Sequence, residues 1–343
     1  MYKVLIADDS ASTRLALEKI IEKEPDFKII GVAFDGEELL RKIEYLKPDV
    51  ITLDLEMPNL NGLKALEKIM KSNPIPVIVV SSLTPAGAKE TITALELGAI
   101  DCILKPSYYP RQSTLDFEKE LVNKLKAAIS ARMFSAKGNE LNNAVRSNEN
   151  SYKNTFDIVI LGISTGGPST LKKIIPYLPA DLPVSFIIAQ HMPLGLTQSL
   201  AENLNKISNI RVKEAKDGDI VSPGRILIAP SGYQTTLKQR QHGVTIKISE
   251  STKDELYRPS IDLLFSSAAK MFKAGVLGII MTGMGSDGTE GAKEIKNAGG
   301  SIIAEAEESC VIYGMPKSAV DAGVVDYVLL LNSIVPKIIE LLS

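Results

Sequence analysis

The chain has little cysteine and no long hydrophobic run. Its two cysteines, Cys102 and Cys310, are too few for a disulfide framework and are typical of a reducing cytosol. No apolar run reaches the roughly 18 residues that a membrane-spanning helix needs. The start, MYKVLIADDS, lacks the basic flank and cleavage site of a signal peptide. The sequence therefore predicts a cytoplasmic protein that does not insert into a membrane.

Charge of one sign is not in excess either. The chain has 39 basic and 41 acidic side chains, which gives no general attraction to nucleic acid or to anionic lipid. With 45% hydrophobic and 23% charged residues, the composition is that of a globular protein. A length of 343 residues is enough for two domains, each with its own core.

The first part of the chain, residues 1–130, alternates apolar runs with helical patterns. The expected strands are Lys3–Ala7, Lys28–Ala33, Val50–Leu53, Val77–Val80 and Cys102–Leu104. The helical patterns between and after them begin near Ser10, Asp35, Gly62, Pro85 and Leu115. This alternation predicts an α/β domain with a doubly wound, five-stranded parallel sheet.

A polar stretch rich in Asn and Ser, residues 131–155, predicts a linker. A second α/β domain is expected over residues 156–343, with a mostly parallel sheet. Its expected strands lie near 157–163, 185–189, 225–229, 276–282, 301–305 and 327–331. Within it, TTLKQRQHGVTIKIS has two alternating segments around a glycine and predicts a β-hairpin.

Acidic residues follow two of the strands in the first domain. Asp8 and Asp9 come after the first strand and Asp54 comes after the third. Because parallel strands end at one edge of a sheet, we expect the three carboxylates to converge there. They would repel one another without a cation, and oxygen ligands favour Mg²⁺. The alternative is that Asp8 or Asp9 caps the helix that begins near Ser10.

The motifs LIADDS, ITLDLEMPNLNG, VIVVSS and CILKP resemble the receiver domain of two-component response regulators, over about residues 1–125. The resemblance implies Asp54 as phosphoacceptor, Asp8, Asp9 and Asp54 as Mg²⁺ ligands, Ser81 as the hydroxyl switch and Lys105 as the phosphate contact. One departure is Cys102, which stands where many receivers have an aromatic switch residue.

The stretch IVILGISTGGPSTL predicts a buried strand, a glycine turn and a helix, with Ser164 at the turn. This layout suits a nucleophile elbow, a phosphate-binding loop or an ordinary α/β connection. GISTGG lacks the Walker spacing and its lysine, which weakens the phosphate-loop interpretation. The glycines would instead let a substrate approach Ser164 closely.

A nucleophilic serine needs a base and an orienting acid, and the chain has only two histidines. His191 follows the apolar run SFIIAQ, and Asp287 follows the run VLGIIM and a glycine-rich loop, so both are expected at the same sheet edge as Ser164. His242 falls at the turn of the predicted hairpin and receives no role. The other role open to Asp287 is to cap the helix after it, and this role is compatible with catalysis.

The motifs LGISTGGPSTL, AQHMP, YRPSIDLLF, MTGMGSDGTEGA and YGMPKSAV resemble the catalytic domain of the CheB family of chemotaxis protein-glutamate methylesterases. The resemblance implies Ser164 as nucleophile, His191 as general acid and base, and Asp287 as its partner, with no cofactor in this domain. The implied substrate is a glutamate γ-methyl ester on the cytoplasmic helices of a chemoreceptor, with deamidation of receptor glutamines as a second activity. The implied phosphodonor of the receiver is the chemotaxis histidine kinase.

Three further residues are candidates around this site. The backbone near Thr165 and near Met284 can supply hydrogen-bond donors to an oxyanion. Arg258, in YRPSID, is a candidate contact for the acidic receptor surface, and a surface ion pair or a helix-start role is equally open.

Two other functions compete with the methylesterase interpretation. A response regulator with a DNA-binding output would need a basic recognition helix, and the second half has none. A hydrolase that acts on a methylated or amidated signalling protein outside chemotaxis stays open.

Overall fold

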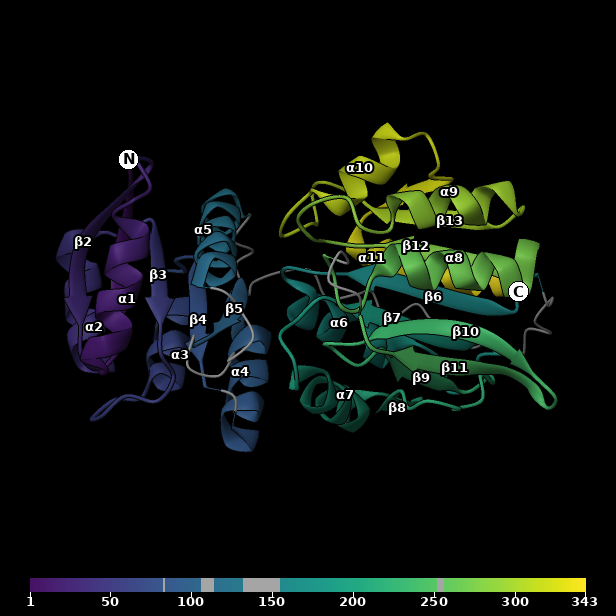
Figure 1. The fold of residues 1–343 in the computed structure, drawn as a ribbon, viewed down its shortest axis with the longest axis horizontal. Helices are drawn as coiled ribbons and strands as arrows, with labels where there is room; N and C mark the ends of the chain where they lie inside the picture. Colours follow the sequence, from purple (N-terminus) through teal and green to yellow (C-terminus); the bar gives the residue numbers. More distant parts are fainter. Residues whose placement is uncertain (83, 106–113, 132–154, 252–255) are drawn as a thin grey trace. The chain divides into compact units, whose positions relative to one another are not determined.

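The computed structural model describes residues 1–82, 84–105, 114–131, 155–251 and 256–343. The chain divides into two compact units, residues 1–137 and residues 138–343 (Figure 1). Most of the predicted linker lies outside the described residues, so the predicted domain boundaries stay predictions. Among the helices of these described ranges, none is both long and apolar enough to cross a membrane.

The first unit has the predicted alternation of strands and helices. Its elements are β1 (Tyr2–Ala7), α1 (Ala11–Ile21), β2 (Phe27–Ala33), α2 (Gly36–Leu46), β3 (Val50–Leu53), α3 (Gly62–Ser72), β4 (Val77–Ser81), α4 (Pro85–Leu97), β5 (Asp101–Leu104) and α5 (Thr114–Ser130). All pairings are parallel, in the order β2-β1-β3-β4-β5, which confirms the doubly wound sheet. Every residue of β3 is buried, because helices cover both faces of such a sheet.

N-cap side chains mark the first residues of helices α1 to α4, and each therefore ends the loop that connects the preceding strand to the helix. Ser10, Asp35, Asn61 and Thr84 each accept a hydrogen bond from the backbone N–H three residues further on. Each N-cap therefore satisfies an N–H group that the helix leaves unpaired. Short capped loops hold the residues after β1, β3 and β4 close to the strand ends.

The second unit is also α/β. Its elements are β6 (Ile158–Ile163), α6 (Gly167–Ile174), η2 (Ile175–Tyr177), β7 (Ser185–Gln190), α7 (Leu196–Ile207), β8 (Arg211–Glu214), β9 (Arg225–Ile228), β10 (Gln234–Arg240), β11 (Gly243–Ser249), α8 (Ile261–Phe272), η3 (Lys273–Gly275), β12 (Val276–Ile280), α9 (Thr289–Asn297), β13 (Ser301–Glu305), α10 (Met315–Asp321), β14 (Tyr327–Leu329) and α11 (Leu331–Leu342).

Seven of these strands form a parallel sheet in the order β14-β13-β12-β6-β7-β9-β8. The predicted hairpin is confirmed as the antiparallel pair β10 and β11, with His242 in its turn. The edge strand β8 was not predicted. Its sequence, RVKE, has only one buried position, so it carries no apolar run to read.

One hydrophobic core holds the sheet, the hairpin and three helices together. Leu237 and Ile246 of the hairpin pack in one cluster with Phe265 of α8, Ile295 of α9 and Met315 of α10. Helix α6 lies beside α7 and α11 in this unit (Figure 1). Helix α8 packs against the sheet through its part of this core, with its first turn near the strand ends.

Candidate active site

Three neighbouring strands of the larger sheet lead into the predicted site. The strand order reverses at β6, because β7, β9 and β8 lie to one side of it and β12, β13 and β14 to the other. In open α/β sheets, ligands bind at such a reversal, beyond the carboxyl ends of the strands. Ser164 follows β6, His191 follows β7, and Asp287 lies between β12 and α9.

Ser164 begins the tight turn that the glycine pair makes possible. Its N–H donates to the carbonyl of Thr282 (2.9 Å), and its carbonyl accepts from the N–H of Gly167 (2.8 Å). Gly166 has φ 80°, which a larger residue adopts only with strain. Ser164 is not among the described residues with positive φ, so a glycine and not the serine takes the unusual conformation. In this respect the turn differs from a strained nucleophile elbow.

His191 and Asp287 are in direct contact. Nε2 of His191 lies 2.8 Å from Oδ2 of Asp287, and their side chains are 11% and 2% exposed. An ionised carboxylate only accepts hydrogen bonds, so Nε2 carries the proton in this pair. Nδ1 of His191 is buried and has no hydrogen-bond partner among the described residues. Nδ1 is therefore the nitrogen that can accept a proton from a nucleophile.

Asp287 sits against the first turn of α8. Its carboxylate accepts hydrogen bonds from the N–H groups of Ile261 (2.8 Å) and Asp262 (3.0 Å), and from Oγ of the N-cap Ser260 (3.2 Å). Burial raises the pKa of Asp287, but the hydrogen bond and the charge of His191, with the backbone donors, lower it by more, so the net direction is down. Asp287 is thus a buried carboxylate held in its charged form.

Asp262 caps the helix that follows Asp287. Its Oδ1 accepts from the N–H groups of Gly288 (2.9 Å) and Gly291 (2.7 Å), at the start of α9. Asp287 also accepts a hydrogen bond from the N–H of Gly288 (3.1 Å), the N-cap residue of α9, so its contact with this helix coexists with its contacts to α8 and His191. Burial, together with the nearby charge of Asp287, raises the pKa of Asp262 to about 6.

Gln190 joins the two loops that carry Ser164 and His191. Its Nε2 donates to the carbonyl of Ser164 (2.9 Å) and to the carbonyl of His191 (2.8 Å), and the residue is 1% exposed. An added Cβ at Gly167 would lie 1.8 Å from Oε1 of Gln190, so the glycine makes room for this side chain. Gln190 is not among the residues predicted from the sequence, although a polar residue at the end of the apolar run SFIIA was an available signal.

The other candidates lie around this centre. Thr165 is 7% exposed and its carbonyl accepts from Oγ1 of Thr282 (3.0 Å). Met284 is 39% exposed, and neither its N–H nor that of Gly285 donates to another described residue. Arg258 is exposed, and its carbonyl accepts from the N–H of Gly232 (3.1 Å). The oxyanion roles of Thr165 and Met284 and the receptor contact of Arg258 stay predictions.

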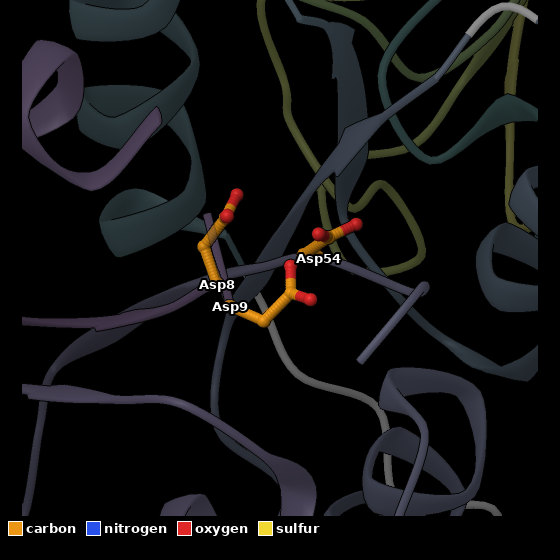
Figure 2. A group of neighbouring side chains, drawn as sticks. All are labelled: Asp8, Asp9 and Asp54. Atoms are coloured by element: carbon orange, nitrogen blue, oxygen red, sulfur yellow. The ribbon is translucent and has the colours of Figure 1, made fainter. Parts of the chain in front are cut away.

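The predicted acidic cluster is present in the first unit. Asp8, Asp9 and Asp54 extend from the ends of β1 and β3, and one oxygen from each lies within 4.8 Å of the others (Figure 2). The N-cap of α1 is Ser10, not Asp8 or Asp9, so the capping alternative for these aspartates is wrong. Nζ of Lys105 lies 2.7 Å from Oδ2 of Asp54 and 3.6 Å from Oδ2 of Asp8.

This cluster fits a hard divalent cation. Burial raises the pKa of Asp54 to about 6 and raises that of Asp8, because Lys105 offsets only part of the cost of a buried charge. Oδ2 of Asp8 is buried and accepts no hydrogen bond from any described residue. The three carboxylates offer only oxygen ligands, and Oδ2 of Asp8 is available for coordination. This donor set matches the coordination that Mg²⁺ prefers.

The hydroxyl of Ser81 makes its hydrogen bonds elsewhere and not with Asp8, Asp9 or Asp54. Its hydroxyl oxygen lies 2.5 Å from Oγ1 of Thr91 on α4 and 3.2 Å from the carbonyl oxygen of Ser82. Thr91 in turn donates to the carbonyl of Gly87 (2.7 Å). A switch role for Ser81 would require its hydroxyl to leave Thr91, and that role stays a prediction.

One α/β unit has an acidic cluster at its strand ends, as a signalling receiver domain does. The other has a histidine–aspartate pair next to a serine turn, as a hydrolytic domain does. The family model for the CheB methylesterase matches residues 159–338, and that for the response regulator receiver domain matches residues 4–112. The chain therefore belongs to the CheB methylesterase family, a family of hydrolases, and carries a receiver domain.

Full-length relatives agree with this assignment. The protein-glutamate methylesterase/protein-glutamine glutaminase of Thermotoga maritima is 44% identical, over 99% of this chain and 98% of its own length. The protein of the same name from Halalkalibacterium halodurans is 41% identical, over 98% and 97%. Among solved structures, the catalytic domain of the Thermotoga maritima CheB methylesterase is 45% identical with a TM-score of 0.53, and the match covers 54% of this chain and 98% of that domain.

We expect Gln190→Met to lower the kcat of ester hydrolysis by about 10- to 100-fold, because small displacements of reacting groups cost that much. The free energy of unfolding should fall by about 1–3 kcal/mol, since a buried carbonyl loses its donor. Steady-state kinetics and thermal unfolding measure the two effects. Gln198→Met, at an exposed position of α7, is the matched control. An unchanged kcat in folded Gln190→Met would contradict the inference that Gln190 holds the loops of Ser164 and His191 in position.

We expect Asp262→Asn to become more stable relative to the wild type as the pH rises from 4 to 6. Asp262 has a pKa of about 6 in the folded chain and the ordinary 3.8 when unfolded, so the folded state holds an extra proton in this window and loses stability as the pH rises. Asparagine keeps the Oδ1 acceptor and does not ionise. Calorimetric unfolding at pH 4, 5, 6 and 7 measures this difference, with the exposed Asp181→Asn as control; a difference independent of pH would refute it.

Proposed function

We propose that this protein hydrolyses glutamate γ-methyl esters on the cytoplasmic helices of chemoreceptors and deamidates receptor glutamines, in the cytoplasm. The observation that carries the proposal is the 2.8 Å bond between His191 and Asp287 at the strand-end edge that also bears Ser164. The names of the full-length relatives supply the substrate class. An ester and a primary amide of the same side chain offer the same carbonyl carbon, so one nucleophile serves both reactions.

The first half-reaction acylates Ser164. Nδ1 of His191 takes the proton from Oγ, and Oγ forms a bond to the γ-carbonyl carbon of the substrate. His191 then returns this proton to the leaving oxygen, the bond between that oxygen and the carbonyl carbon breaks, and methanol departs. Asp287 keeps the imidazole in one tautomer and stabilises the positive charge that it carries in between. In deamidation the leaving group is ammonia.

The second half-reaction frees the enzyme. Water takes the place of Oγ as the nucleophile, and His191 accepts its proton. The acyl bond to Ser164 breaks, the proton returns to Oγ, and the product is the glutamate side chain. In both halves the carbonyl oxygen becomes negative, and the backbone near Thr165 and Met284 is the proposed donor to it. The N–H groups of Met284 and Gly285 donate to no other described residue, which supports this assignment for the second loop.

In the receiver, Asp54 is the proposed phosphoacceptor and a chemotaxis histidine kinase the proposed donor. Asp8, Asp9 and Asp54 would hold Mg²⁺, which supplies positive charge to the phosphoryl oxygens when it is bound. Lys105, already 2.7 Å from Asp54, would contact one phosphoryl oxygen, and Ser81 another. Phosphorylation would relieve a restriction that the unphosphorylated receiver places on the hydrolase; a tenfold activation needs a shift of only about 1.4 kcal/mol.

The second candidate keeps the hydrolase but changes its substrate to a methylated signalling protein outside chemotaxis. Both candidates need the same residues in the same roles. A comparison of methanol release from methylated chemoreceptor and from other methylated proteins of the same cell separates them. Neither candidate involves nucleic acid or membrane insertion.

We expect Ser164→Ala and His191→Gln each to reduce methanol release from methylated receptor by ~10⁴-fold or more, the usual cost of losing a member of such a triad. His242→Gln is the control for the histidine, because His242 is exposed in the hairpin turn. Near-normal release from folded Ser164→Ala would exclude this serine as the nucleophile.

We expect Asp54→Asn to keep basal methanol release and to lose its stimulation by a small-molecule phosphodonor. Removal of Mg²⁺ with a chelator should have the same effect on the wild type, because phosphoryl transfer to a carboxylate needs the charge compensation. Rates with and without acetyl phosphate measure both. Stimulation that persists in Asp54→Asn would mean that another residue accepts the phosphoryl group.

A further inference from the structure

An aromatic ring covers the face of the imidazole of His191. The ring centroids of His191 and Tyr257 are 4.6 Å apart and their planes differ by only 3°. Tyr257 is half-buried and belongs to the segment that leads into α8. The proposed roles of Ser164, His191 and Asp287 make no use of this residue.

Hydrogen bonds hold the segment that carries Tyr257 in place. Gln234, at the start of β10 and 2% exposed, donates from Nε2 to the carbonyl of Tyr257 (2.8 Å) and accepts at Oε1 from the N–H of Ser260 (2.8 Å). The carbonyl of Arg258 between them accepts from the N–H of Gly232 (3.1 Å). The ring therefore rests on a backbone that is tied to the hairpin.

The loop on the other side leaves room for the tyrosine. An added Cβ at Gly285 would lie 2.8 Å from Oη of Tyr257, and Gly285 has φ 89°, so a larger residue is disfavoured on both counts. Burial, followed by the charges of Asp287 and Asp262, raises the pKa of Tyr257, so its hydroxyl stays neutral. A neutral, flat ring is thus presented to the imidazole.

We infer that Tyr257 is a positioning residue that fixes the ring plane of His191. The hydrogen bond from Nε2 to Asp287 fixes one point of the imidazole but permits the ring to turn about the line through that bond. The parallel contact with Tyr257 removes this freedom, so that Nδ1 keeps one direction. The ring also shields the imidazole, whose side chain is 11% exposed, from water. The role belongs to the aromatic face of Tyr257 and needs no hydroxyl.

The inference rests on the proposed function for its kinetic part, and its structural part is tested separately. We expect Tyr257→Leu to lower the kcat of methanol release by about 10- to 100-fold with KM changed less than about twofold. Tyr257→Phe, which keeps the ring, should retain kcat within about threefold. A KM that rises in Tyr257→Leu with unchanged kcat would instead make Tyr257 a wall of the substrate site and would overturn the inference, as would a Phe variant as slow as the Leu variant.

The second readout needs no substrate. The chain has only two histidines, so in protein labelled with ¹⁵N-histidine the ring signals of His191 and of the exposed His242 are assigned with one variant, His242→Gln. We expect the Nε2 proton of His191 to exchange with water at least tenfold faster in Tyr257→Leu than in the wild type, and at the wild-type rate in Tyr257→Phe, with His242 constant throughout. Equal exchange in all three proteins would overturn the inference. If the wild type releases no methanol, the proposed function fails while this measurement still decides the role of Tyr257.

Discussion

The catalytic unit is organised around one buried negative charge, the carboxylate of Asp287. A charge that is 2% exposed is unfavourable unless donors surround it, and the first turn of α8 provides them. The helix terminus adds the positive end of its dipole. Once the charge is satisfied in this way, it can hold the proton on Nε2 of His191 and leave Nδ1 free of partners in the described structure. The position of α8 therefore determines how the carboxylate of Asp287 is held.

In the receiver unit, buried carboxylates are also unfavourable, but the protein supplies fewer hydrogen-bond donors to them. There, Asp8 and Asp54 have few backbone donors, burial raises their pKa values, and Lys105 compensates only part of the charge. A site of this kind gains from a bound cation, whereas five hydrogen bonds from the protein itself stabilise the carboxylate of Asp287. Hydrogen bonds within the protein thus keep Asp287 ionised, whereas Asp8 and Asp54 are only partly compensated by the protein.

Three further side chains make contacts around Ser164, His191 and Asp287. Gln190 ties the carbonyls of Ser164 and His191 together, and Tyr257 lies flat on the imidazole. Asp262 orders the start of α9 next to Asp287. Gln190 ends β7, Tyr257 lies in the segment before α8, and Asp262 lies in the first turn of α8. In this region, the same contacts contribute to the stability of the fold and to the geometry of the site.

The sequence by itself determined the two parallel sheets and the residues at their strand ends. Parallel strands that are buried on both faces have apolar runs as their sequences, and such strands end at one edge of the sheet. The sequence alone therefore predicts that Ser164, His191 and Asp287 lie at the same edge. The glycines of the serine turn, the acidic set Asp8, Asp9 and Asp54, and the hairpin follow from equally local patterns.

Only the tertiary structure decided what has no local signature. The edge strand β8 is too polar and too short for an apolar run, so only its pairing with β9 reveals it. That Asp287 accepts hydrogen bonds from the first turn of α8 depends on how a segment distant in the sequence packs against the sheet, as does the choice of Nε2 of His191 as its partner. Gln190 and Tyr257 look like any buried amide and any half-buried aromatic until their contacts are seen. Side-chain direction and long-range packing arise from the whole folded chain, because no short stretch of sequence contains both partners of such contacts.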